Sequence, residues 1–257
     1  MNKTLIITCA TGTIGESVCK YLAGKGYNLI LISKSQEKLN TLKTYLTNNY
    51  SIKVKYVVIN FDYECDFNIL KSVCSSFINV MGLVLITPKI TPTSNCFPEK
   101  YEWEENFRRV FINPLELLKN IVPYLQLNNM RAKIVIISGI SSVQALPNYV
   151  INNAIRTAWL GQAKSLALHY GGNGIHINTL SLGGIMTDIF LKNVDNESLE
   201  CGKSPQEILA AKIDNVPLKK YASLSEVSVV IENLLSGFTD HITGANIICD
   251  GGFIKSY

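Results

Sequence analysis

Short runs of apolar residues alternate along the chain with longer stretches whose apolar residues recur every three or four positions. The short runs predict buried strands, and the periodic stretches predict amphipathic helices. Strands are expected at residues 4–8, 28–33, 54–60, 82–87, 133–138, 174–180 and 245–249. Helices are expected at 14–25, 36–48, 66–78, 103–126 and 147–168, followed by a helix-rich stretch before the last strand.

This alternation predicts the α/β class, as a doubly wound Rossmann fold. The expected architecture is a central parallel sheet of about seven strands with helices on both faces. A length of 257 residues suits one such domain covering residues 1–257, and no linker divides it. Ligands bind to such sheets beyond the carboxyl ends of the strands, so the loops that follow the strands should carry the functional residues.

Composition narrows the classes of partner. Hydrophobic residues make up 47% of the chain and charged residues 17%, which is typical of a well-packed soluble protein. The net charge of +4 is modest, and no dense Lys/Arg run predicts a nucleic-acid partner. No apolar run reaches membrane-spanning length, and the first one lacks the features of a signal peptide, so it is interpreted as the first strand. Seven scattered cysteines without a CxxC pair predict reduced thiols in the cytoplasm, with neither disulfides nor a zinc site.

The turn after the first strand reads Thr8-Cys9-Ala10-Thr11-Gly12-Thr13-Ile14-Gly15. Glycines between a strand and a helix let the backbone approach a pyrophosphate, which then sits at the helix N-terminus. Cys9 departs from this pattern, and its Cβ is unfavourable if the turn needs a positive φ there. The alternative is a tight turn that binds nothing. Cofactor contacts are expected from Thr8, Gly12, Thr13, Ile14 and Gly15.

The second strand ends at Ser33-Lys34-Ser35. An acidic residue at this place would accept hydrogen bonds from the ribose of NAD, whereas a basic residue with hydroxyls suits the 2′-phosphate of NADP. Ser33 and Lys34 therefore favour NADP(H) over NAD(H). The alternative for Lys34 is an ordinary surface lysine.

The glycine turn and two later segments together resemble the short-chain dehydrogenase/reductase family. Residues 174–187 match the family pattern Gly-Ile-x-Val-Asn-x-x-x-Pro-Gly-x-x-x-Thr, with Leu182 in place of the proline, and residues 242–252 resemble its closing strand. The resemblance covers essentially the whole chain. It implies an oxidoreductase that uses a nicotinamide dinucleotide, with Asn60 near the adenine and Gly183, Ile185 and Thr187 near the nicotinamide.

The same resemblance implies further features of the molecule. Residues 188–216 would form a mobile lid, in which Ile189, Phe190 and Leu191 face an apolar small-molecule substrate. The chain would assemble as a homodimer or homotetramer, since the closing strand of the family usually helps to build a tetramer.

The catalytic positions depart from the family. They hold Val110, Gly139, Asn152 and Arg156, and none of these is the usual residue. The helix at 147–168 should carry Tyr-x-x-x-Lys in a usual member, and its two places are Asn152 and Arg156. The usual mechanism cannot operate with this set, because a phenol must exchange a proton with the substrate.

A second alignment keeps a tyrosine in the site. Pro147-Asn148-Tyr149 followed by Arg156 resembles the Pro-Asn-Tyr and Tyr-x6-Lys of the enoyl-acyl-carrier-protein reductases. Seven residues are almost two helical turns, so Tyr149 and Arg156 would lie on one helix face. Tyr149 would supply the proton, while Arg156, which stays protonated, would orient the ribose and stabilise negative charge. The structural alternatives are an aromatic residue packed at the helix entry and a surface ion pair.

Two hypotheses of function remain open. The first is an atypical NADP(H)-dependent reductase of a carbonyl or enoyl substrate, with Tyr149 and Arg156 as its catalytic residues. The second is a catalytically inactive dinucleotide-binding homologue that acts as a partner subunit or sensor, since all four usual residues are replaced.

Overall fold

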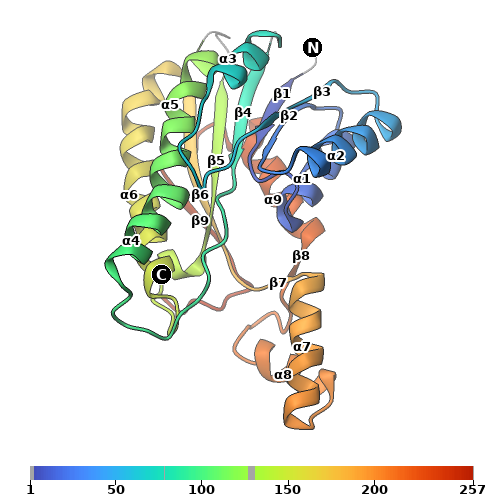
Figure 1. Ribbon diagram of the computed structural model, residues 1–257, viewed down its shortest axis with the longest axis vertical. Helices are drawn as coiled ribbons and strands as arrows, with labels where there is room; N and C mark the ends of the chain where they lie inside the picture. The colour runs from blue at the N-terminus through green and yellow to red at the C-terminus, as the bar shows by residue number, and fades with distance from the viewer. Residues whose placement is uncertain (1–2, 78, 127–130, 257) are drawn as a thin grey trace.

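The central sheet has the predicted seven strands, all parallel, in the order β3-β2-β1-β4-β5-β6-β9 (Figure 1). The computed structural model describes residues 3–77, 79–126 and 131–256. The strands are β1 (Thr4–Ile7), β2 (Asn28–Ser33), β3 (Val54–Val58), β4 (Val80–Leu85), β5 (Ala132–Gly139), β6 (Ile175–Leu182) and β9 (Asn246–Cys249). The prediction of one parallel sheet is confirmed.

Helices cover both faces of this sheet, which confirms the doubly wound fold. One face carries α1 (Thr13–Gly24), α2 (Gln36–Asn49) and α9 (Leu224–Leu235). The other carries α3 (Asn68–Ser75), α5 (Asn113–Gln126) and α6 (Val150–Tyr170). Short 3₁₀-helices occur at Ile140–Ser142, Gly171–Asn173 and Gly237–Thr239. In the described part of the chain, no helix is both long enough and apolar enough to span a membrane.

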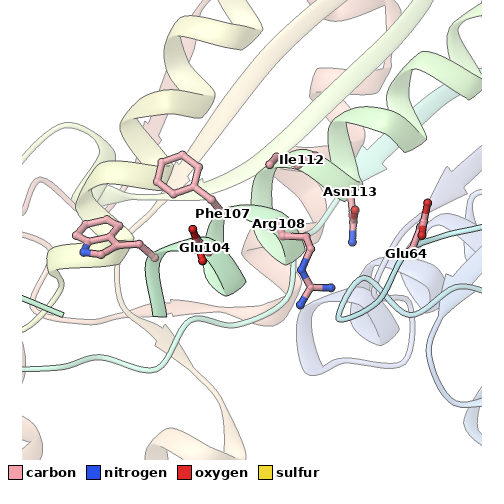
Figure 2. A pocket seen from close by; sticks show the side chains of 7 residues that line it. Glu64, Glu104, Phe107, Arg108, Ile112 and Asn113 are labelled. Carbon is pink, nitrogen blue, oxygen red and sulfur yellow. The ribbon is translucent and has the colours of Figure 1, made fainter. Parts of the chain in front are cut away.

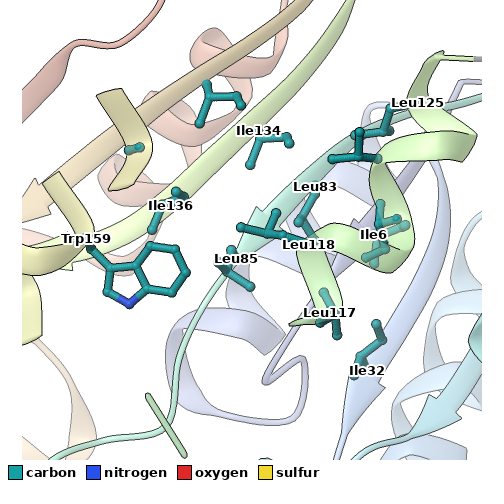
Figure 3. Close-up of a cluster of buried hydrophobic side chains, with 14 of the residues drawn as sticks. Ile6, Ile32, Leu83, Leu85, Leu117, Leu118, Leu125, Ile134, Ile136 and Trp159 are labelled. Atoms are coloured by element: carbon teal, nitrogen blue, oxygen red, sulfur yellow. The ribbon is translucent and has the colours of Figure 1, made fainter. Parts of the chain in front are cut away.

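The two faces explain why the strands read as continuous apolar runs. Every residue of β1, β2, β4 and β5 is buried, because a parallel sheet is covered on both sides. On one face, Ile6, Leu83 and Ile136 from three strands meet Leu118 of α5 and Trp159 of α6 (Figure 3). These contacts hold α6, the helix expected to carry the catalytic residues, against the middle of the sheet.

The strand order reverses between β1 and β4. After β1 the chain moves through α1 toward β2 and β3, and it then crosses back to place β4 on the opposite side of β1. The loops that leave β1 and β4 therefore diverge at their carboxyl ends. This is the place at which doubly wound sheets form a ligand crevice.

Two helices differ from the prediction. The helix expected at 103–126 is α4 (Lys100–Phe107), a π-helical turn (Arg108–Ile112) and then α5. Turns of this π type occur frequently at functional sites. The helix expected from 147 begins at Val150, and Tyr149 is its N-cap residue with φ −124° and ψ 33°. Tyr149 therefore lies just outside the helix on which it was expected.

The predicted lid is a helical pair that projects from the body of the molecule (Figure 1). It contains α7 (Asp188–Cys201) and α8 (Pro205–Ile213). Two short strands that the sequence did not predict, β7 (Ile185–Met186) and β8 (Ala222–Ser223), pair in parallel at its base. The helices α7 and α8 thus join the body of the molecule at this one two-stranded sheet, which is a suitable arrangement for a hinge.

Candidate active site

The glycine turn brings the N-terminus of α1 against the end of β1. Cys9 has a φ of +46°, so the turn does place a side chain in the left-handed region. A Cβ at Gly15 would stand 2.9 Å from the Cα of Ala10, so the turn has room only for glycine at this position. The N–H groups of residues 13–15 lie in the first turn of α1, where a helix offers no carbonyl partners. This arrangement suits an anion such as a pyrophosphate.

Thr8 has a different role from the expected cofactor contact. Its side chain is fully buried and lines none of the three cavities described below. The Thr8 hydroxyl donates to the carbonyl oxygen of Ile86 at 2.6 Å and accepts from the Ile86 N–H at 2.7 Å. It thereby ties the ends of β1 and β4 together at the point where their loops separate.

A cavity of about 340 Å³ lies beyond the ends of β2 and β3, where the adenosine half of a dinucleotide was expected. Gly12, Ser33, Lys34 and Asn60 all line it, as the sequence analysis predicted. Lys38, Lys89 and Arg109 line it as well, and the sequence analysis missed all three.

The electrostatic balance of this cavity is positive. Four cationic side chains line it, those of Lys34, Lys38, Lys89 and Arg109, against the single carboxylate of Asp62. Lys34 forms an ion pair with Asp62 at 3.0 Å, and Nε of Arg109 lies 3.7 Å from the same carboxylate. A cavity with this excess of positive charge suits a phosphate group.

Lys38 could have been found from the sequence. Ser35 is the N-cap of α2, and its hydroxyl accepts from the Lys38 N–H at 3.3 Å. A hydroxyl cap followed three residues later by lysine places that lysine in the first turn of the helix. Arg109 gives no such signal, because it comes from the π-helical turn about 75 residues further along the chain.

A second cavity, of about 560 Å³, continues the cleft toward β5 and β6. Pro88 and Lys89 line both cavities, so the two are neighbours along one crevice. Eight of the predicted site residues line this cavity: Thr13, Ile14, Gly15, Tyr149, Arg156, Gly183, Ile185 and Thr187. Apart from Thr8, the structure thus brings every predicted site residue to one cleft.

Two of the four usual catalytic positions have structural roles here. Asn152 is 2% exposed, does not line the cleft, and has its Nδ2 3.5 Å from the carbonyl oxygen of Ile90. Val110 lies in the π-helical turn, and its carbonyl oxygen accepts from Trp159 Nε1 at 3.0 Å. Neither side chain offers a group that could exchange a proton with a substrate.

The other two positions, Gly139 and Arg156, form one unit. The guanidinium of Arg156 lies over Gly139, and a Cβ added there would stand 2.7 Å from Cζ. Arg156 thus occupies the space that a serine side chain at position 139 would need. It donates from Nη1 to the hydroxyl of Ser141 at 3.0 Å. Burial lowers the pKa of Arg156 and the neighbouring Tyr149 phenol raises it, but a guanidinium remains protonated near neutral pH.

Tyr149 reaches the cleft from the segment before α6. Asn148 has a φ of +63°, and its carbonyl oxygen accepts from the Thr93 N–H at 2.8 Å. This contact belongs to an isolated parallel bridge between Thr93 and Tyr149. The loop that follows β4 therefore holds Tyr149 on the same cavity as Arg156, although the two do not share a helix.

One of the three apolar residues expected to face the substrate does line the cleft. Ile189 lines it, whereas the Phe190 ring packs against Tyr221 with centroids 5.1 Å apart, and Leu191 is exposed. The hydroxyl of Thr187 caps α7 by accepting from the Phe190 N–H at 3.1 Å. Thr187 thus lies at the junction between the cleft and the lid.

A third cavity, of about 820 Å³, lies along α4 and the π-helical turn (Figure 2). Two of its polar side chains, those of Arg108 and Asn113, already bind the segment after β3. Arg108 donates to the carbonyl oxygen of Asp62 at 2.7 Å, and Asn113 donates to those of Phe61 and Tyr63. Its remaining surface includes Ile112, which is 50% exposed. This cavity lacks the reactive groups that the cleft contains.

Comparisons with known proteins agree with this geometry. Residues 10–254 match the family described as enoyl-(acyl carrier protein) reductase. The 3-oxoacyl-[acyl-carrier-protein] reductase FabG of Rickettsia conorii is 26% identical over 254 residues, which cover 98% of this chain and 97% of that protein.

Solved structures share the fold over the whole chain. L-sorbose reductase from Gluconobacter frateurii, complexed with NADPH and L-sorbose, superposes with a TM-score of 0.92 at 22% identity, covering 100% of this chain and 98% of that one. An NADPH-bound short-chain oxidoreductase from Pseudomonas aeruginosa that contains an atypical catalytic centre superposes with a TM-score of 0.88 at 17% identity, covering 99% and 98%.

Proposed function

The chain belongs to the short-chain dehydrogenase/reductase family of oxidoreductases, and from that premise we propose that it reduces a carbonyl or enoyl substrate with NADPH. Tyr149 supplies the proton, and Arg156 orients the ribose and stabilises negative charge on the substrate. The observation that carries this proposal is that Tyr149 and Arg156 line one cavity together with Gly183, Ile185 and Thr187.

The residues of the cleft fit a dinucleotide. The first turn of α1 supplies N–H donors for a pyrophosphate beside Gly12 and Gly15. The four cations of the adenosine end support NADP(H), because a 2′-phosphate adds negative charge at that end. Relatives of known structure bind either nucleotide, among them a xylitol dehydrogenase with NAD⁺ bound and the sorbose reductase with NADPH.

A bound NADPH would supply the hydride. The protein itself would contribute three effects: a proton, hydrogen-bond donors for the developing charge, and the exclusion of water. The phenol of Tyr149 donates the proton that the reduced substrate needs, and Arg156 offers donors to the oxygen on which negative charge develops. Apolar side chains that include Ile137, Ile185 and Ile189 line the same cavity and exclude water around these groups.

A nucleotide titration followed by substitution of Tyr149 tests the proposal. NADPH should raise the melting temperature more than NADH does at equal concentration, because NADPH should bind more tightly. A ligand at a hundredfold excess over its Kd stabilises the fold by about 2.7 kcal/mol. Tyr149→Phe should keep NADPH binding and lower kcat about 100-fold or more with any reducible substrate. Tyr101→Phe, which changes a phenol that is 66% exposed, is the matched control.

The alternative hypothesis, an inactive dinucleotide-binding homologue, predicts a different result. NADPH would bind, but no panel of ketones and enones would give NADPH oxidation that depends on the protein. Full activity of Tyr149→Phe would instead exclude the role of Tyr149 and leave a reductase with another proton donor.

We also propose that the chain assembles with copies of itself, as the sequence analysis expected. The partly exposed apolar side chains of Trp103, Phe107 and Ile112 along α4 and the π-helical turn support a contact there. Sedimentation of Ile112→Glu against the unchanged protein tests this surface.

A further inference from the structure

Arg156 carries a charge that the described part of the protein leaves unmatched. None of the ion pairs among the described residues involves Arg156, and its hydrogen-bond partner there is the neutral hydroxyl of Ser141. No aspartate or glutamate is among the described residues that line the cavity of Tyr149 and Arg156. Arg156 is partly buried, and a charge withdrawn from water without a counter-charge is costly, so this position favours an anion.

The guanidinium has donors to spare for such an anion. Arginine carries five N–H donors in a planar fork, and the bond to Ser141 uses one of them. Ribose hydroxyls can accept from the others, but they are neutral and do not balance the charge. A carboxylate does both, because its two oxygens match the fork in a bidentate pair.

Ser138 supplies a second, independent observation. Its side chain is 9% exposed and lines the same cavity as Arg156. Among the described residues, its hydroxyl is the buried side-chain group that lacks a hydrogen-bond partner. Ser138 directly precedes Gly139, over which the guanidinium lies, and Ser138, Gly139 and Arg156 all line this cavity at the end of β5. Buried polar groups of this kind are normally satisfied, which indicates a ligand atom at this place.

The rest of the cavity is largely apolar. Ile86, Ile90, Leu146, Trp159 and Ile189 contribute to its walls, and its further polar residues are Thr13, Thr87, Lys89 and Thr187. A ligand that fits this surface therefore has an apolar body and one anionic group. The low-dielectric walls also strengthen the attraction between that group and Arg156.

We propose that the substrate carries a carboxylate directly beside its reducible carbon, and that Arg156 and Ser138 bind this carboxylate. The substrate class is thus an apolar 2-oxo acid or 2-enoic acid. The position of the reducible carbon rests on the proposed function, whereas the carboxylate site does not.

The reaction of a 2-oxo acid balances without a further reactant. NADPH transfers a hydride to C2, the π bond of the C2 carbonyl breaks, and its oxygen takes the proton of Tyr149. The products are a 2-hydroxy acid and NADP⁺, and Tyr149 regains its proton from solvent. For a 2-enoic acid the hydride adds to C3 and the proton to C2.

Calorimetric titration of the full chain saturated with NADP⁺ tests the site through binding alone. The probes are 4-methyl-2-oxopentanoate, its amide 4-methyl-2-oxopentanamide, and trans-4-methyl-2-pentenoate. At least one of the two acids should bind about tenfold or more tightly than the neutral amide. Arg156→Gln should abolish this preference, and Ser138→Ala should reduce it severalfold. Lys203→Gln, which removes an exposed lysine of the lid, should leave it unchanged.

A parallel assay of NADPH oxidation separates the two proposals. Acids that bind through Arg156, with no NADPH oxidation from them or from a panel of neutral ketones and enones, would support the carboxylate site and overturn the reductase. Reduction of neutral ketones with no preference for acids, and with the same KM in Arg156→Gln, would overturn the carboxylate site and leave the reductase intact. Equal affinity for the acids and the amide in the unchanged protein would also overturn the site.

Discussion

Arg156 and Gly139 are complementary: the guanidinium of one fills the space that a side chain on the other would occupy. A Cβ on Gly139 would lie 2.7 Å from Cζ and 3.3 Å from Nε of Arg156. The arginine at position 156 therefore occupies the space that the usual serine at position 139 would need. An arginine at position 156 in this rotamer requires glycine at position 139.

Restoring the usual serine at position 139 should harm this protein. Gly139→Ser forces the guanidinium out of its place and breaks its bond to Ser141, and because the displaced atoms are the end of a flexible side chain, the cost should be about 1 kcal/mol, at the low end of the range for overpacking. We expect a lower melting temperature and loss of the binding that depends on Arg156. Gly161→Ser is the matched control, because a Cβ at Gly161 meets nothing within 4 Å.

A second variant identifies the cause. Gly139→Ser combined with Arg156→Ala should recover the stability lost in the single variant, because the alanine side chain no longer reaches position 139. A double variant as unstable as Gly139→Ser would mean that the clash lies elsewhere.

The cationic cavity predicts nucleotide preference. Lys38→Ala and Lys34→Ala should each weaken NADPH binding about tenfold, since a charge-assisted hydrogen bond contributes about 1.5–3 kcal/mol and exposure reduces this. NADH binding should hardly change, because NADH lacks the 2′-phosphate. Titrations with both nucleotides measure the ratio, with Lys71→Ala on exposed α3 as the control. An equal loss for NADPH and NADH would argue against a 2′-phosphate contact.

Cys9 stands at a backbone position that favours glycine. Its φ of +46° costs about 1–2 kcal/mol for a residue with a Cβ. Cys9→Gly should keep the stability within about 1 kcal/mol, because relief of this strain offsets the lost packing of the thiol. Cys9→Val should lower the free energy of unfolding by about 2 kcal/mol or more, because a β-branched side chain tolerates positive φ poorly. Urea denaturation of the three proteins measures the difference, and equal stability of the two variants would contradict the argument.

The buried Lys133 predicts sensitivity to acid. Its Nζ lies 2.9 Å from the carboxylate of Asp240, and donation from Lys133, with help from Arg131, holds the pKa of Asp240 below its ordinary value. Since the folded pKa is the lower one, the pair stabilises the protein fully above the unfolded-state pKa of about 3.9. That contribution is lost as the pH falls through the folded value.

Asp240→Asn isolates this effect. At pH 7 the variant should be clearly less stable than the unchanged protein, because Lys133 keeps only neutral partners such as Thr239. The difference in stability between the two proteins should shrink as the pH falls below about 4. Urea denaturation across this range measures it, and a difference that stays constant with pH would contradict the ion pair as its source.

The sequence alone determined the fold and located a part of the residues that line the cleft. The strands β1, β2 and β4 are covered on both faces, so each appears as a nearly continuous apolar run that can be located without any partner. The glycine turn is equally local, because its tight geometry depends on residues within one strand-to-helix connection. Gly12, Ser33, Lys34 and Asn60 could be placed on one cavity for the same reason: each belongs to or follows a strand or turn that the pattern locates.

The tertiary structure decided what the side chains of the site do. The exclusion of Asn152 from the cleft, the presence of Arg109 in the cationic cavity and the position of Tyr149 before α6 all depend on how separate elements meet. Thr8 braces two strands 78 residues apart along the chain for the same reason. Hydrophobic periodicity records which face of an element is buried, but not which distant group it meets. The fit of Arg156 over Gly139 therefore becomes visible only when α6 has packed against the end of β5.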